Sequence, residues 1–280
     1  MRNLLSAGFV RLWKSKMLWG SCAAVAAVTL YAVLASWSDR ARFGYQGLDY
    51  SIDAVFLCYV PFIAIFIPIV CTLVVGVEHA DGTVRNKLIV GHSKESVYLS
   101  NLLLCSAASL IICTFAVVME LSVGRSLLGE FEMGVPRAVL FFLAVYALAL
   151  VWTALSTLLA MLVTRRAIAI VAAVLVVLAL MLIGVYLEGR LEAPPTLQGY
   201  TLSANGELVQ SDPSPNPHYL EEGPVRSLFQ FLCDFTPGGQ TLQHVQRTAD
   251  RPERFIIYNS LIFAAVTAAG VLLFRCKDLK

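Results

Sequence analysis

Two long apolar segments, AVLFFLAVYALALVWTALSTLLAMLV at Ala138–Val163 and AIAIVAAVLVVLALMLIGVYL at Ala167–Leu187, decide the fold class. Only the three residues Thr-Arg-Arg separate them. A helix needs about 20 mostly apolar residues to cross roughly 30 Å of hydrocarbon at 1.5 Å per residue. Each segment meets this requirement, so the pair predicts two transmembrane helices joined by a short polar connection.

Four further segments of the same kind occur along the chain. They are Trp19–Ser36, Ala54–Val77, Val97–Met119 and Phe255–Phe274. None of the six segments contains Asp, Glu, Lys, Arg or His. Of the 280 residues, 58% are apolar and 14% are charged, and the mean hydropathy is +0.73, whereas a soluble domain carries about 25% charged residues. Because no alternating strand pattern occurs, we expect an all-α polytopic membrane protein with six transmembrane helices in one transmembrane domain over residues 1–280.

Basic residues concentrate on one side of these segments. That side holds twelve of them: Arg2, Arg11, Lys14, Lys16, Arg85, Lys87, Lys94, Arg165, Arg166, Arg275, Lys277 and Lys280. The short loops on the opposite side hold only Arg40, Arg42, Arg125 and Arg137. Short loops rich in Lys and Arg stay in the cytoplasm. The sequence therefore predicts a multi-pass protein of the cell membrane with both termini in the cytoplasm.

The segment before the first span, Arg2–Met17, predicts an amphipathic interfacial helix. On a helical wheel its apolar face comprises Leu5, Phe9, Leu12 and Trp13, and its basic face comprises Arg11 and Lys14. Such a helix lies in the membrane interface and turns into the bilayer near Trp19. The alternative is that the first span simply begins earlier.

A short amphipathic helix is also predicted between the second and third spans, within residues 78–93. Asp81-Gly82 favours a turn that Gly82 permits, Thr83 is a candidate cap, and Gly91 can end the helix in a left-handed conformation. The apolar stripe comprises Val84, Leu88 and Ile89, while Arg85 and Lys87 stay polar and Ser93 caps the third span. The pattern is typical of a helix that crosses the cytoplasmic membrane face and receives force from a partner.

The long segment between the fifth and sixth spans, Glu188–Arg254, is expected outside the cell. Eight of the eleven prolines lie in it, and its first part is expected to be irregular. Val225–Phe235 is apolar and aromatic but too short to span, so a surface-lying or shallowly re-entrant helix is predicted there.

No pattern of a catalytic or cofactor site stands out, so an enzyme is not expected, and neither is a metal or cofactor on this chain. The sequence lacks a GxxxxGK[ST] loop, a GxSxG elbow, an HExxH motif and a CxxC pair among its seven cysteines. Glu221-Glu222 and Arg226 match the EExxxR pattern of intramembrane proteases, but the match lies outside the spans and is ascribed to chance. The spans offer only Glu78, Glu120 and Glu188 at their ends as relay groups for ion coupling. A partner at the cytoplasmic face would then have to supply the energy.

Over nearly its whole length the chain resembles the permease subunits of type-2 ABC exporters, in particular bacterial permeases of antibiotic or bacteriocin export and immunity. Two stretches carry the resemblance: Glu78-x-x-x-Gly82-Thr83-x-Arg85 after the second span, and Asp234-Phe-Thr-Pro237-Gly238-Gly239-Gln240 in the outer segment. The order of spans and the basic tail beginning at Phe274 agree with it. The chain departs from the family at Tyr98–Asn101, where many members place a lysine at the start of the third span.

The resemblance implies a dimer of permeases, identical or paralogous, that works with two separate ATPase subunits, and ATP and Mg²⁺ bind those subunits. The residues it assigns to ATPase coupling are Glu78, Gly82, Thr83, Arg85, Lys87 and Leu88; those of the interfacial helix are Phe9, Arg11, Trp13 and Lys14; those of the outer segment are Pro237, Gly238 and Gln240. It places the dimer interface at small residues of two spans, although packing within one chain explains the same alanines. These are Ala23, Ala26 and Ala27 of the first span and Ala167, Ala169, Ala172 and Ala173 of the fifth. The expected cargo is an amphipathic or hydrophobic molecule such as an antimicrobial peptide. A polytopic membrane protease and a non-transporting scaffold or sensor are the alternatives.

Overall fold

The computed structural model describes residues 2–43, 51–202, 208–210, 212–246, 248–249 and 251–277, and it is predominantly helical. Six of its helical segments are long and apolar enough to cross a membrane: Lys16–Arg42, Ile52–Ala80, Lys94–Leu128, Val135–Leu162, Arg166–Leu191 and Pro252–Cys276. The prediction of an all-α polytopic membrane fold is therefore confirmed.

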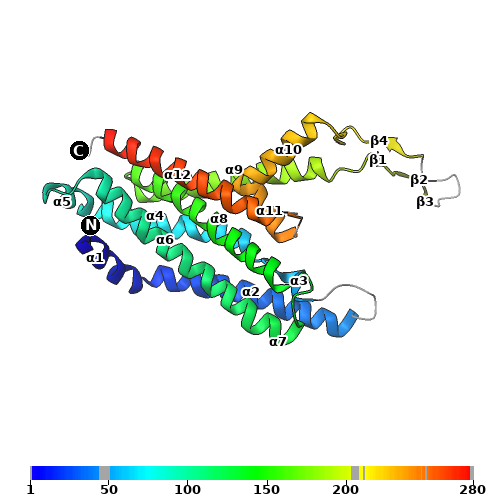
Figure 1. The fold of residues 1–280 in the computed structure, drawn as a ribbon, viewed down its shortest axis with the longest axis horizontal. Coiled ribbons are helices and arrows are strands. Elements are labelled where there is room, and N and C mark those ends of the chain that lie inside the picture. Colours follow the sequence, from blue (N-terminus) through cyan, green and yellow to red (C-terminus); the bar gives the residue numbers. More distant parts are fainter. Residues whose placement is uncertain are drawn as a thin grey trace.

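The helices form an elongated bundle around α8 (Val135–Leu162), which packs against α12 (Pro252–Cys276), α4 (Val60–Ala80) and α6 (Lys94–Met119). Aromatic side chains such as Trp152 and Phe141 are fully buried in this core. Figure 1 shows α1 (Arg2–Trp13), α5 (Thr83–Ile89) and the last turn of α12 at the same end of the bundle, which we call the N/C end. The other end, called the far end, carries α3 (Ile52–Val55) and α7 (Arg125–Leu128).

The chain breaks between α1 and α2 (Lys16–Phe43), so the first span does not simply begin early. Trp19 stabilises the corner, because its indole Nε1 donates a hydrogen bond to the carbonyl of Trp13 at 2.8 Å. Leu12 is buried against the bundle, whereas Phe9 and Trp13 are exposed. These two aromatic side chains are therefore free to contact the membrane interface, as expected for an interfacial helix.

The third span continues past its predicted end at Met119. A π-helical turn at Glu120–Gly124 follows α6 and leads directly into α7. Glu120 is consequently not a residue at the end of a span: it lies inside a continuous helical segment and is fully buried. The expectation that the ionisable residues of the spans lie only at their ends is wrong for this carboxylate.

The segment between the fifth span, α9 (Arg166–Leu191), and the sixth is more ordered than expected. Two antiparallel pairs of short strands extend from the body at the far end (Figure 1): β1 (Thr196–Leu197) with β4 (Ser214–Pro215), and β2 (Tyr200–Leu202) with β3 (Leu208–Gln210). The predicted short helix follows as α10 (Pro224–Phe235), and a further helix, α11 (Pro237–Gln246), turns back into the bundle and packs on α9, α8 and α4. The element that packs into the bundle is thus α11, while six of the twelve residues of α10 are exposed.

Candidate functional site

Glu78 joins three separate elements at the N/C end. It lies in the last turn of α4 and is 2% exposed. Arg11 on α1 donates a hydrogen bond from Nη2 to Oε1 at 2.7 Å, and Lys87 on α5 donates from Nζ to both carboxylate oxygens at 2.7 Å. We call Arg11, Glu78 and Lys87 the Glu78 cluster. The sequence prediction named all three residues, and the structure brings them together across 67 positions of sequence.

The turn into α5 places Lys87 beside Glu78. Gly82 adopts φ +66°, in the left-handed region that a side chain disfavours, and it precedes the first residue of the helix. Thr83 does not cap α5 as predicted; its hydroxyl donates to the carbonyl of Glu78 at 2.9 Å and so closes the turn. Gly91 at φ +98° ends the segment, and Ser93 caps α6 by accepting from the amide of Ser96, as predicted.

Only part of the predicted apolar stripe of α5 is buried. Val84 is buried and Leu88 packs against the core. Ile89 is 74% exposed, and its neighbour Val90 is 78% exposed. Arg85 is also exposed. Ile89 continues the predicted apolar stripe as the last residue of this two-turn helix, and its side chain stays exposed. The outer side of α5 thus combines a cation with two apolar side chains, a composition suited to binding another protein.

The Glu78 cluster holds α1, α4 and α5 together through paired charges. One carboxylate removed from water faces two cations, whose side chains are 39% exposed for Arg11 and 17% exposed for Lys87. Burying a carboxylate is costly unless it is paired, so loss of either partner leaves Glu78 less well compensated. Displacement of α5 must therefore move α4 and α1 with it or separate these charges.

Two lysines fix the C-terminal end of α12 near this cluster. Lys94 donates from Nζ to the carbonyls of Arg275 and Lys277, and Lys277 donates from Nζ to the carbonyl of Met161 at the end of α8. Burial lowers the pKa of Lys277 from its ordinary value. Cations at helix C-termini satisfy carbonyls that lack helical partners.

The outer motif is a packing element. Gln240 on α11 is fully buried; its Nε2 donates to the carbonyl of Asp234, and Asn259 on α12 donates from Nδ2 to its Oε1 at 2.8 Å. Pro237 and Gly238 are buried with it. Gln240 therefore ties α10 and α12 to α11.

Glycines allow α11 to reach its position. A Cβ added to Gly184 on α9 would lie 2.6 Å from the amide nitrogen of Gly239, and one on Gly238 would overlap the carbonyl of Leu180. Because the atoms on the other side are backbone, no side-chain rearrangement can relieve these contacts. The two helices touch backbone to backbone at this crossing.

His244 on α11 is a buried titratable residue that the sequence did not single out. Its ring lies between the rings of Phe141 and Phe255, and Nδ1 pairs with the carbonyl of Gln240. Burial lowers the pKa of His244 to about 4, so its ring is neutral near pH 7. Nothing in the surrounding sequence distinguishes this histidine from one in a surface loop.

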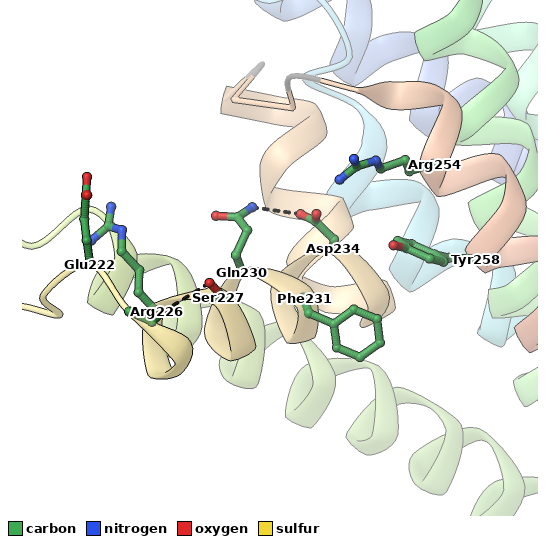
Figure 2. A pocket seen from close by; sticks show the side chains of 9 residues that line it. Glu222, Arg226, Ser227, Gln230, Phe231, Asp234, Arg254 and Tyr258 are labelled. Atoms are coloured by element: carbon green, nitrogen blue, oxygen red, sulfur yellow. Dashed lines mark hydrogen bonds between the residues drawn. The ribbon is translucent and has the colours of Figure 1, made fainter.

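A polar groove opens between α10 and α12 at the far end. It has a volume of about 580 Å³. Figure 2 shows Gln230 and Asp234 of α10 facing Arg254 of α12, with Tyr258 beside them. Gln230 and Gln243 both donate to Oδ1 of Asp234. The groove thus offers an acidic group held by two amide donors, with a basic and an aromatic side chain beside it, which suits a polar ligand with apolar parts.

Glu120 forms a second buried polar feature. Its Oε1 accepts the amide of Leu57 at 2.9 Å, in the irregular stretch between α3 and α4, where Leu57 adopts φ +61°. Its Oε2 has no hydrogen-bond partner among the described residues. The carboxylate thereby satisfies a backbone donor that the broken helix leaves free.

The protease-like match is not on a spanning helix. Glu221 and Glu222 are exposed in the turn before α10, and Arg226 donates to the carbonyls of Leu220 and Leu191.

Within the described residues, no group of three or more His, Cys, Asp or Glu side chains could hold a metal ion. A scan against protein-family models finds no match for this chain, and a search of curated proteins finds none either.

Proposed function

We propose that the chain is the transmembrane subunit of an ATP-driven exporter of the type-2 ABC class, with the N/C end in the cytoplasm of a bacterial cell. The observation that carries the proposal is the Glu78 cluster, which ties an exposed short helix and an interfacial helix to the end of a core span. A separate ATPase that binds ATP and Mg²⁺ would press on α5, and the cluster would pass the displacement to α4 and α1.

The apolar, exposed faces of two spans support a dimer. On α2, Ala23 and Ala27 are exposed, whereas on α9 the alanines Ala169 and Ala173 are buried within the chain. The fifth span thus uses some of its small residues for packing onto its own bundle, as the alternative interpretation expected. The rest of α9 and the exposed face of α2 would contact lipid or the second permease. The cargo would be an amphipathic molecule, such as an antimicrobial peptide.

Arg85→Glu should reduce the stimulation of ATP hydrolysis by cargo several-fold in the purified complex. It reverses the exposed charge on the outer side of α5, where the ATPase would bind. A photo-crosslinking residue at Ile89 should yield a product that contains an ATPase with a nucleotide-binding loop. The same residue at Leu197, exposed on β1, is the matched control and should yield none. Unchanged stimulation by Arg85→Glu together with no ATPase product at Ile89 would contradict the proposal.

One observation favours a second candidate, a proton-coupled transporter: Glu120 is a fully buried carboxylate whose Oε2 has no hydrogen-bond partner within the part of the chain that the structure describes. Glu120→Gln discriminates the two, because glutamine keeps an acceptor for the Leu57 amide but cannot titrate. An ATP-driven exporter should retain efflux of amphipathic peptide antibiotics with this variant, and a proton-coupled one should lose it.

Glu120→Leu should cost about 1–3 kcal/mol of unfolding free energy, since it leaves the Leu57 amide unpaired. Reversible unfolding in mixed micelles measures this cost.

A further inference from the structure

A pocket beside the Glu78 cluster has no role in the function proposed above. It has a volume of about 360 Å³ and lies between the start of α2, the last turns of α4 and the first residue of α9. This size is in the range of pockets that hold small molecules. Three of its nine lining residues are basic and none is acidic. The remaining walls are mostly apolar, with Leu73, Val74 and Val77 contributed by α4.

The basic side chains converge from three elements. Arg11 comes from α1, Lys14 from the corner between α1 and α2, and Arg166 from the start of α9. In the described part of the chain the side chains of Lys14 and Arg166 form no hydrogen bond or ion pair. The stem of Arg166 is held in place, because it packs against Gly76, where an added Cβ would come within 2.8 Å of its Cγ.

Arg11 connects the pocket to the Glu78 cluster. Only its Nη2 is used by Glu78, at 2.7 Å. A guanidinium carries five N–H donors, so Arg11 can bind a second anion from the pocket side without releasing the first.

We propose that this pocket binds the phosphate headgroup of an anionic phospholipid, with the acyl chains lying along the apolar side of α4 and the exposed Met17 on α2. Two features favour a lipid over a soluble anion or a protein segment. The charge is purely basic, and the apolar wall continues into spans that are themselves long enough to cross the membrane. Basic pockets between transmembrane helices are suited to anionic headgroups. The bound lipid would brace α1 against α4 through Arg11. The inference does not depend on the proposed function.

The test uses the full chain purified in detergent, with native mass spectrometry and thermal unfolding. Dioleoylphosphatidylglycerol, dioleoylphosphatidylcholine and inorganic phosphate are the three probes. We expect the anionic lipid to be retained and to raise the unfolding temperature, with at least tenfold tighter binding than the zwitterionic lipid, and phosphate to have no effect at equal concentration. Equal stabilisation by both lipids, or by phosphate alone, would overturn the proposal.

Matched variants locate the site. Lys14→Gln with Arg166→Gln removes two pocket charges and should weaken binding of the anionic lipid about 25-fold, or about fivefold for each charge. Lys16→Gln with Arg165→Gln removes the same charge from exposed neighbours that do not line the pocket and should leave binding unchanged. Lys14→Arg with Arg166→Lys keeps the charges and should bind as the parent does. The assignment would be refuted if the pocket variant and the exposed-neighbour variant lost the same affinity for the anionic lipid. It would also be refuted if the pocket variant changed the oligomer mass and still bound as much lipid as the parent.

Discussion

Replacing Glu78 by alanine is expected to lower the free energy of unfolding by about 2 kcal/mol. Breaking a fully buried ion pair costs roughly 3–5 kcal/mol, and the partial exposure of Arg11 and Lys87 reduces that cost. Under the proposed function, the same change should also reduce the stimulation of ATP hydrolysis by cargo, because the carboxylate that pairs with Lys87 of α5 is lost. Reversible unfolding in mixed micelles and ATPase assays of the complex measure the two effects.

A double-mutant cycle separates the ion pair from the general effect of losing a side chain. Glu78→Ala and Lys87→Ala together should cost less than the sum of the single changes, with a coupling energy of about 1–2 kcal/mol. Glu130→Ala is the matched control, since it removes a glutamate from the exposed pair with Arg125 and should change stability by less than about 0.5 kcal/mol. Additive effects at Glu78 and Lys87 would show that their ion pair contributes no interaction energy to the stability of the fold.

Adding a single methyl group at Gly238 is expected to have the other large effect. In Gly238→Ala the new Cβ overlaps the carbonyl of Leu180, and in Gly184→Ala it lies 2.5 Å from the carbonyl carbon of Gly238. Since backbone cannot move aside as a side chain can, each change should cost roughly 3 kcal/mol or more and release α11 from the bundle. Unfolding titrations, together with solvent labelling of the buried Cys233, measure the loss.

Gly189→Ala supplies the control on the same helix. No atom lies within 4 Å of a Cβ built at Gly189, so alanine should be neutral or stabilise α9 by up to about 1 kcal/mol through its better helix propensity. Similar losses at Gly184 and Gly189 would mean that helix propensity, rather than the crossing with α11, governs the result.

Local patterns predicted much of this fold. The six spans follow from apolar runs, because the thickness of the hydrocarbon core is fixed. Whether a helix can cross it depends only on the length and polarity of the helix's own consecutive residues. The turn at Gly82 and the cap at Ser93 were also readable, since each depends on a few neighbouring residues. A separate entry helix was predicted as well, but α1 ends at Trp13 and α2 begins at Lys16, before the turn expected near Trp19. The helix α10 followed from its aromatic pattern and its short length.

The predictions that failed concern hydrogen bonds that a short sequence pattern does not specify. Thr83 has the chemistry of a cap, but the nearest free carbonyl belongs to Glu78 and takes its hydroxyl. The strand pairs β1–β4 and β2–β3 lie in a proline-rich stretch whose composition favours irregular structure.

The sequence by itself determined that this is a six-span helical membrane protein with short amphipathic helices flanking its first and second spans. Only the tertiary structure decided which charges meet. Arg11 reaches Glu78 across 67 positions, Glu120 is sealed inside the bundle beside Leu57, and Gly238 contacts α9 through backbone alone. Helix formation depends on neighbouring residues, whereas burial and ion pairing depend on which faces of separate helices pack together, and no local pattern encodes that choice.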